Sequence, residues 1–193
     1  MNSLRERLIF LSGFFVRPAT VRSVSQSTRH MTDRILYHAG AMNGGVVVEW
    51  GAGLGVLTRR LLQVIPPDGY LLSFENHPQY ARELKRKLSG PQLEVVAEDA
   101  SKTPEYLRQR GLPKASHIIS TIPIRGEDAG QMLDAAAAAL EPGGRYVQIG
   151  LWCSRELKNS SFQYHGRELV WWNVPPEVIH VMECRNGSAN TGG

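Results

Sequence analysis

The stretch VVVEWGAGLG, residues 46–55, decides the fold of this chain of 193 residues. It begins with three valines and ends in alternating glycines, Gly51, Gly53 and Gly55. A continuous apolar run closed by an acid, here Glu49, is typical of a buried parallel strand. Glycines permit a tight turn and a close backbone approach to a ligand, and a following helix offers free N–H groups and its positive dipole end. The stretch therefore predicts a strand, a ligand-binding turn and a helix.

Apolar runs and helical patterns alternate along the rest of the chain. They predict strands over residues 45–50, 70–74, 93–97, 116–120 and 145–151, and helices over 32–39, 54–64, 78–88, 104–110 and 128–140. Two further strands, over 168–172 and 178–183, flank a turn. This alternation predicts an α/β fold: a mostly parallel seven-stranded sheet with an antiparallel C-terminal strand and helices on both faces.

Acidic residues follow the next two predicted strands. Glu75 ends the second strand, and Asp99 follows the third. A carboxylate in the first position can accept hydrogen bonds from both hydroxyls of a ribose, and one in the second can accept from an adenine amino group. Because the carboxyl ends of parallel strands meet at one crevice, the glycine turn and both acids indicate a cofactor that contains adenosine.

The spacing of the glycines distinguishes between adenosine cofactors. A dinucleotide site needs a glycine where this chain has Val56, and Glu49 beside the turn would repel a pyrophosphate but suit the ammonium of a methionine group. The pattern E-x-G-x-G-x-G with Glu75 and Asp99 resembles motifs I to III of the class I S-adenosylmethionine-dependent methyltransferases, which have a Rossmann-like fold. The resemblance implies that S-adenosyl-L-methionine contacts ten residues: Glu49, Gly51, Ala52, Gly53, Gly55, Glu75, Asn76, Asp99, Ala100 and Ser120.

Four further stretches are similar to the bacterial phospholipid N-methyltransferases. They are residues 10–27, the EDA of 98–100, the STIPI of 120–124 and the WWNVPP of 171–176. The resemblance implies N-methylation of an amino headgroup lipid, similar to phosphatidylethanolamine, at a membrane surface. Thr121 and Pro123 lie in the motif that would orient the amine, and Tyr37 is a candidate catalytic residue. The proton acceptor is open among Tyr37, His38 and Glu49.

Other functions remain open at this stage. The ribosomal RNA adenine dimethylases have a similar core, but they carry Asn or Asp, then Pro and an aromatic residue, after the fourth strand. Here Thr121 and Ile124 stand in place of the polar and aromatic residues, so a nucleic-acid substrate is disfavoured. The alternatives are a soluble small-molecule N- or O-methyltransferase, with the N-terminal helix as a lid, and a binding module without an acceptor site.

The excess positive charge lies at the N-terminus. Residues 1–30 contain five arginines and one acid, whereas the rest of the chain has as many basic as acidic residues. Leu4, Leu8, Leu11 and Phe15 share one helical face, which predicts a basic amphipathic helix suited to an anionic membrane surface. We expect three segments: this helix with a linker over 1–30, a cofactor-binding domain over 31–185 and a disordered tail over 186–193.

Composition excludes several other classes. The apolar fraction of 42% suits a single folded domain, and no apolar run is long enough for a membrane-spanning helix. Two cysteines, Cys153 and Cys184, rule out a disulfide scaffold and fit no zinc spacing, so no metal is expected. These features predict a cytoplasmic protein, peripheral on the inner membrane if the lipid hypothesis holds. They specify neither the oligomeric state nor the number of methyl groups transferred.

Overall fold

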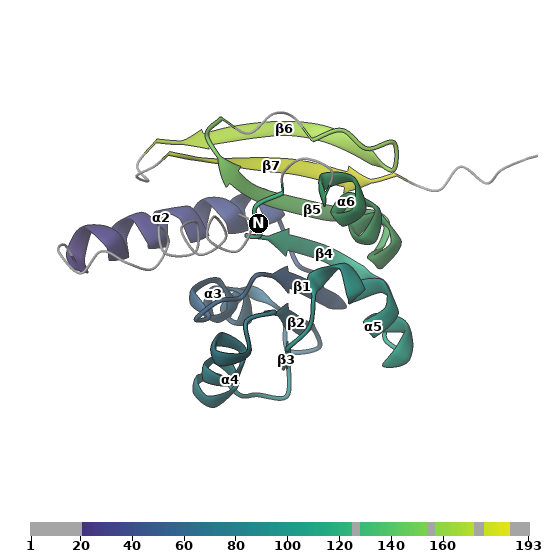
Figure 1. Cartoon of the computed structure of the whole chain (residues 1–193), viewed down its shortest axis with the longest axis horizontal. Helices are drawn as coiled ribbons and strands as arrows, with labels where there is room; N and C mark the ends of the chain where they lie inside the picture. Colours follow the sequence, from purple (N-terminus) through teal and green to yellow (C-terminus); the bar gives the residue numbers. More distant parts are fainter. Residues whose placement is uncertain (1–20, 125–127, 154–156, 172–175, 186–193) are drawn as a thin grey trace, which may run out of the picture.

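The computed structural model describes residues 21–124, 128–153, 157–171 and 176–185. Its seven strands form one sheet in the order β3-β2-β1-β4-β5-β7-β6 (Figure 1). The strands are β1 Val46–Trp50, β2 Tyr70–Phe74, β3 Leu93–Val96, β4 Ala115–Ser120, β5 Leu140–Leu151, β6 Phe162–Val170 and β7 Glu177–Cys184. Only β7 runs antiparallel to both of its neighbours, β5 and β6. The predicted mixed sheet with an antiparallel C-terminal strand is confirmed.

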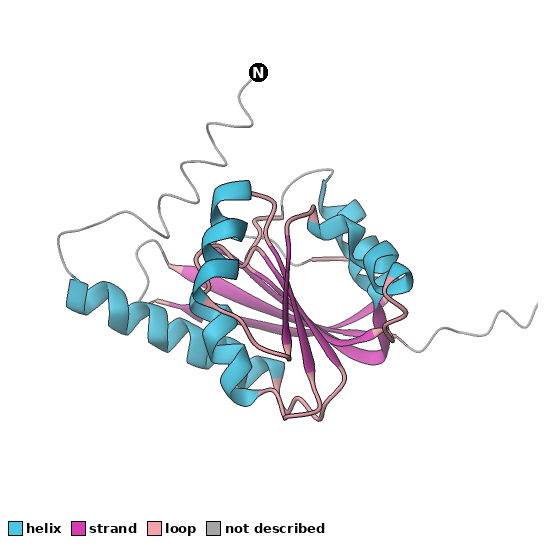
Figure 2. Ribbon diagram, turned by 90° about the horizontal axis from the view of Figure 1, so that it is seen from below, coloured by secondary structure: helices cyan, strands magenta, loops and turns pink. Residues whose placement is uncertain are grey.

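Helices cover both faces of the sheet, as Figure 2 shows. They are α2 Val21–Ala39, α3 Val56–Val64, α4 Pro78–Lys87, the short η1 Ala100–Lys102, α5 Thr103–Gln109 and α6 Asp128–Ala139. Successive side chains of a strand point to opposite faces, so β1 contributes to two cores. Val47 packs with Leu57 and Leu61 of α3 in one core. Val48 and Trp50 pack with residues of α5 and α6 in the other.

Two predictions of secondary structure are corrected. The helix before β1 was expected over residues 32–39, after a linker, but α2 begins at Val21 and runs without a break to Ala39. The apolar residues of α2 that pack on the domain are Met31, Ile35 and Ala39. The helical spacing in the sequence therefore begins about ten residues after the helix itself. Strand β6 occupies Phe162–Val170, whereas the prediction placed it over 168–172. This edge strand exposes alternate polar side chains and therefore lacks a continuous apolar run.

Two predictions concern segments outside the described residues. They are the amphipathic helix at the N-terminus, on which Leu4 to Phe15 share one face, and the tail over 186–193. Both stay predictions.

Candidate cofactor and acceptor site

The glycine turn joins the carboxyl end of β1 to α3. Its three glycines have positive φ angles of 83° at Gly51, 54° at Gly53 and 82° at Gly55, a backbone conformation that favours glycine. The backbone N–H groups of Gly51 and Ala52 donate to the carbonyl oxygen of Phe74 at 2.9 and 3.0 Å, which fixes the turn against the end of β2. A Cβ at Gly51 would lie 2.8 Å from Thr121 Oγ1. The segments that follow β1 and β4 therefore approach each other closely only because residue 51 has no side chain.

Glu75 connects the glycine turn with the segment after β2. Its side chain is 5% exposed; Oε2 accepts from the N–H of Gly53 at 2.7 Å, and Oε1 accepts from the N–H of His77 at 2.8 Å. Each carboxylate oxygen can accept a further hydrogen bond, so this geometry fits the two hydroxyls of a ribose. Glu75 thus holds the turn in place and can bind the ligand with the same group.

Asp99 lies after β3, at the start of η1. Its Oδ1 accepts from the backbone N–H of Ser101 at 2.9 Å and from Ser101 Oγ at 2.7 Å. Asp99 and Asn76 are exposed, whereas Ala100 is buried. Since β1, β2 and β3 are adjacent and parallel, the glycine turn, Glu75 and Asp99 lie along the same edge of the sheet. We call it the carboxyl edge, because it is formed by the carboxyl ends of the parallel strands.

Glu49 is buried directly below the glycine turn. Its Oε2 accepts from Thr58 Oγ1 and Ser73 Oγ, both at 2.7 Å, so the carboxyl group links β1, α3 and β2. Its other oxygen, Oε1, is buried and makes no hydrogen bond within the described part of the chain. Burial raises the pKa of Glu49 to about 7. Such a group fits a cationic partner, because a nearby positive charge would favour the carboxylate. Thr58 and Ser73 were not among the site residues expected from the sequence. Thr58 lies on α3, directly after the glycine turn, and Ser73 lies on β2.

The acceptor segment, residues 120–124, follows β4 beside the turn. Thr121 Oγ1 donates to the carbonyl oxygen of Gly51 at 2.8 Å, and Ser120 is fully buried. Gln148 of β5 donates from Nε2 to the carbonyl oxygen of Ile122 at 2.8 Å. Its Oε1 accepts from the hydroxyl of Tyr146 at 2.6 Å. Sequence reasoning missed Gln148, although a polar residue inside an otherwise apolar strand is a signal for such a role.

Comparisons with known proteins agree with this geometry. No model of a protein family matches the chain. Over 150 residues, 76% of this chain and 78% of the relative, it is 26% identical to an ornithine lipid N-methyltransferase of Singulisphaera acidiphila. Its fold matches magnesium protoporphyrin IX methyltransferase of Synechocystis PCC 6803, solved with bound S-adenosylmethionine, at a TM-score of 0.62. That match has 12% identity and covers 93% of this chain and 91% of the other.

The chain has the fold of the class I S-adenosylmethionine-dependent methyltransferases. A second structure with this fold is TrmN of Thermus thermophilus, with a TM-score of 0.66 and 17% identity. The match covers 90% of this chain but only 52% of TrmN, so the chain spans about half the length of that protein. S-adenosylmethionine is bound in the structure of the protoporphyrin methyltransferase, and the glycine turn of this chain with Glu75 fits the nucleoside part of that cofactor. Among the residues described above, no cluster of His, Cys, Asp and Glu could hold a metal ion.

Tyr37 is not brought together with the other expected site residues. It lies on α2 with its side chain 69% exposed, and its ring contacts Arg34 and His38. Near this point the carbonyl of His38 accepts from Arg145 of β5, and the carbonyl of Ala39 lies 3.2 Å from His117 Nε2 of β4. The expected catalytic role of Tyr37 therefore has no support from its position, and it stays a prediction.

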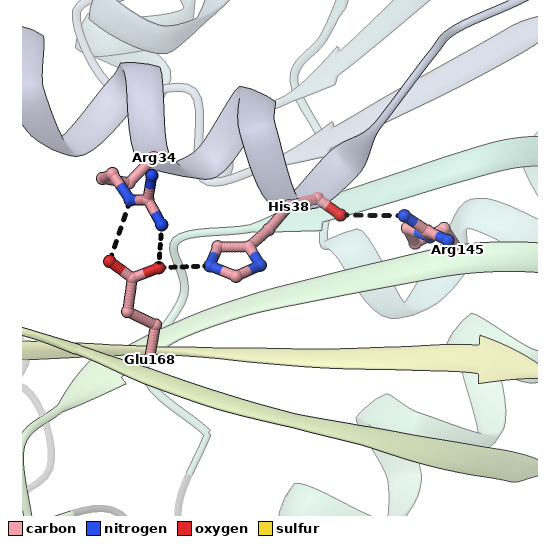
Figure 3. Close-up of polar contacts among 4 residues, drawn as sticks. All are labelled: Arg34, His38, Arg145 and Glu168. Atoms are coloured by element: carbon pink, nitrogen blue, oxygen red, sulfur yellow. Dashed lines mark hydrogen bonds and ion pairs between the residues drawn. The ribbon is translucent and has the colours of Figure 1, made fainter.

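One carboxylate fixes α2 to the edge strand of the methyltransferase. Glu168 of β6 accepts two hydrogen bonds from Arg34, at 2.8 and 2.5 Å, and its Oε2 lies 2.5 Å from His38 Nε2 (Figure 3). The Arg34 guanidinium lowers the pKa of Glu168, with a smaller contribution from His38. The pair is bidentate and less than one third exposed, which makes it stronger than an ordinary surface ion pair.

Replacing Glu168 with glutamine should loosen α2 while leaving the sheet folded. We expect the free energy of local opening to fall by about 1–2 kcal/mol, because charge-assisted hydrogen bonds contribute in this range. Hydrogen exchange of the α2 amides would then accelerate about tenfold. The matched control is Glu183→Gln on β7, whose carboxylate pairs with His165 instead. Equal exchange rates in the two variants would contradict the assigned role of Glu168.

Proposed function

We propose that this methyltransferase N-methylates the amine of a membrane lipid with an amino headgroup, of the phosphatidylethanolamine type. The observation that carries the proposal is the 26% identity, over 150 residues, to an ornithine lipid N-methyltransferase. Phosphatidylethanolamine and ornithine lipids share a primary amine close to the polar surface of a bilayer. The sequence of the acceptor segment supports the same substrate class, because it lacks the amide and the aromatic ring that hold a flipped adenine.

The residues of the chain act in this reaction mainly by holding the amine in position beside the methyl group of the cofactor. The cofactor supplies an activated methyl group, and the attacking amine must be neutral and in line with it. Thr121 holds the acceptor segment against Gly51, and Gln148 fixes the carbonyl of Ile122. We infer that carbonyl oxygens of residues 120–123 accept the N–H groups of the amine and aim its lone pair. Pro123 cannot donate a backbone hydrogen bond, which keeps this stretch an acceptor surface.

The membrane location is part of the proposal. In the ranges that the structure describes, no helix is both long and apolar enough to cross a bilayer. The basic residues of the segment 1–30 would bind anionic phosphates by electrostatic attraction. We therefore place the enzyme on the cytoplasmic surface of the inner membrane, with residues 31–185 as its catalytic domain.

A substrate screen tests the function. The full chain would be incubated with S-adenosylmethionine labelled in its methyl group and, in separate reactions, phosphatidylethanolamine vesicles, ornithine lipid vesicles, free ethanolamine, free ornithine and RNA. We expect label in one of the two lipids and none in the free amines or RNA. Label in a free amine alone would replace the proposal with a soluble small-molecule methyltransferase. Label in RNA alone would replace it with a nucleic-acid methyltransferase.

A further inference from the structure

Two tryptophans on the methyltransferase are strongly exposed. The side chain of Trp152 is 56% exposed and that of Trp171 is 69% exposed. Trp50, by contrast, is fully buried and donates from Nε1 to Thr103 Oγ1 at 2.8 Å. An indole carries a large apolar surface and one N–H donor, so two exposed copies close together indicate a surface that meets a partner.

Strand register places the two tryptophans side by side. Leu151 of β5 pairs with Glu177 of β7, and Glu177 pairs with Val170 of β6. Trp152 and Trp171 are the residues that directly follow Leu151 and Val170. Their backbones are therefore separated by two strand spacings, about 10 Å. The N–H of Trp152 donates to the carbonyl of Pro176 at 3.1 Å, which extends the pairing to this residue.

Both tryptophans lie at the carboxyl edge. Strands β5 and β6 run in the same direction, because each is antiparallel to β7, and β5 is parallel to β4 and hence to β1. The glycine turn and the acceptor segment follow β1 and β4 at that edge. A partner bound by the tryptophans would thus face the reacting end of the sheet.

Helix α2 extends toward the same edge with its amino end. The carboxyl end of α2 contacts the amino ends of β4 and β5, where the carbonyl of Ala39 lies 3.2 Å from His117 Nε2. The amino end of α2 therefore points toward the carboxyl edge, and Figures 1 and 2 show it extending past the ends of β6 and β7. From Arg34, beside Glu168, the helix continues for about 20 Å to Val21, at 1.5 Å per residue. Residues 21–30 of this part of α2 include Arg22 and Arg29, and the remaining arginines of the segment 1–30, whose net charge is +4, precede Val21 in the chain.

We propose that Trp152 and Trp171 form an interfacial anchor that holds the carboxyl edge against an anionic lipid bilayer. Indole rings favour the boundary between headgroups and acyl chains, and the positive charge of residues 1–30, which include the amino-terminal part of α2, complements anionic headgroups. The proposal deepens the lipid N-methyltransferase function and rests on it. It adds the orientation in which the enzyme meets its substrate, with the acceptor segment facing the membrane.

Vesicle partitioning of full-length variants tests the anchor. The probe is a vesicle of phosphatidylcholine with about one quarter anionic phosphatidylglycerol, a proportion that gives a negative surface potential. Removing both indoles in the double variant Trp152→Ala/Trp171→Ala should lower the partition coefficient at least about tenfold, since each buries apolar surface in the interface. The matched control is Val64→Ala, because Val64 is 46% exposed but ends α3 at the opposite edge of the sheet. This control should partition like the wild type.

Two further readouts separate anchoring from a structural role. Lipids brominated in the acyl chain should quench wild-type fluorescence, and the double variant, in which Trp50 and Trp172 continue to emit, should show clearly less of this quenching. With a short-chain phosphatidylethanolamine dissolved as monomers, the double variant should keep wild-type activity, whereas activity on vesicles should fall with partitioning.

Unchanged partitioning or unchanged quenching in the double variant overturns the anchor. If the anchor fails but the wild type still methylates lipid amines, the proposed function stands. If the wild type methylates no lipid amine, in vesicles or as monomers, the proposed function is wrong.

Discussion

Replacing Gly51 with alanine should reduce the affinity for S-adenosylmethionine at least about 100-fold, a loss of about 2.8 kcal/mol, because the glycine turn must move to admit the new Cβ. The φ angle of Gly51 is 83°, and a Cβ would meet Thr121 Oγ1 at 2.8 Å and Ile122 Cγ1 at 3.0 Å. The turn would have to move away from the acceptor segment, and the hydrogen bond from Thr121 to the Gly51 carbonyl would break. Both halves of the site depend on that contact, so methyl transfer should become undetectable.

A second glycine separates the clash from backbone strain. Gly111 also has a positive φ angle, 62°, but a Cβ there would meet no atom within 4 Å. Gly111→Ala therefore carries a similar conformational cost, about 1–2 kcal/mol, without touching the site. Calorimetric titration should show normal cofactor affinity for this variant and almost none for Gly51→Ala. Wild-type affinity in Gly51→Ala would mean that the glycine turn does not hold the cofactor.

The parallel half of the fold could be predicted from the sequence because burial is complete there. Strands β1 and β2 have sheet neighbours on both sides and helices on both faces, and each has only one polar residue, Glu49 and Ser73. The prediction for β2 matches the observed strand at both ends, Tyr70–Phe74. Glu75 was expected at its carboxyl end for the same reason, since an acid after a buried strand stands out.

The remaining features depend on tertiary contacts that a local pattern does not contain. Strand β6 pairs on one side only, and its polar residues satisfy an edge position without any apolar periodicity. The contact of Glu168 with Arg34 joins residues 134 positions apart, and Gln148 acts across the sheet on Ile122. The exposure of Trp171 also differs from what composition suggests, because an aromatic pair at 171–172 is more often buried. These contacts fix α2, the acceptor segment and the carboxyl edge.

Replacing Glu49 with glutamine should change how the stability of the protein depends on pH. Burial raises the pKa of Glu49 from 4.5 to about 7 in the folded state, despite hydrogen bonds from Thr58 and Ser73 that favour the carboxylate. Between pH 4.5 and about 7, Glu49 therefore keeps its proton in the folded protein but loses it in the unfolded chain. The stability that this group contributes is complete below pH 4.5 and is lost as pH rises through 7. At about 1.4 kcal/mol per pH unit, the loss approaches roughly 3 kcal/mol.

Glutamine cannot ionise, so the variant should escape this loss. Urea unfolding at several pH values from about 4.5 to 8 should show the stability of Glu49→Gln rising relative to the wild type by about 2–3 kcal/mol. Glu141→Gln, which alters an exposed carboxyl group, should follow the wild-type curve. Parallel curves for Glu49→Gln and wild type would mean that Glu49 is ionised in the folded protein across this range. A raised pKa of Glu49 also has a consequence for cofactor binding. A buried carboxyl group that titrates near neutrality can be held as a carboxylate by a bound ammonium group. Its free oxygen, Oε1, is where that group would act.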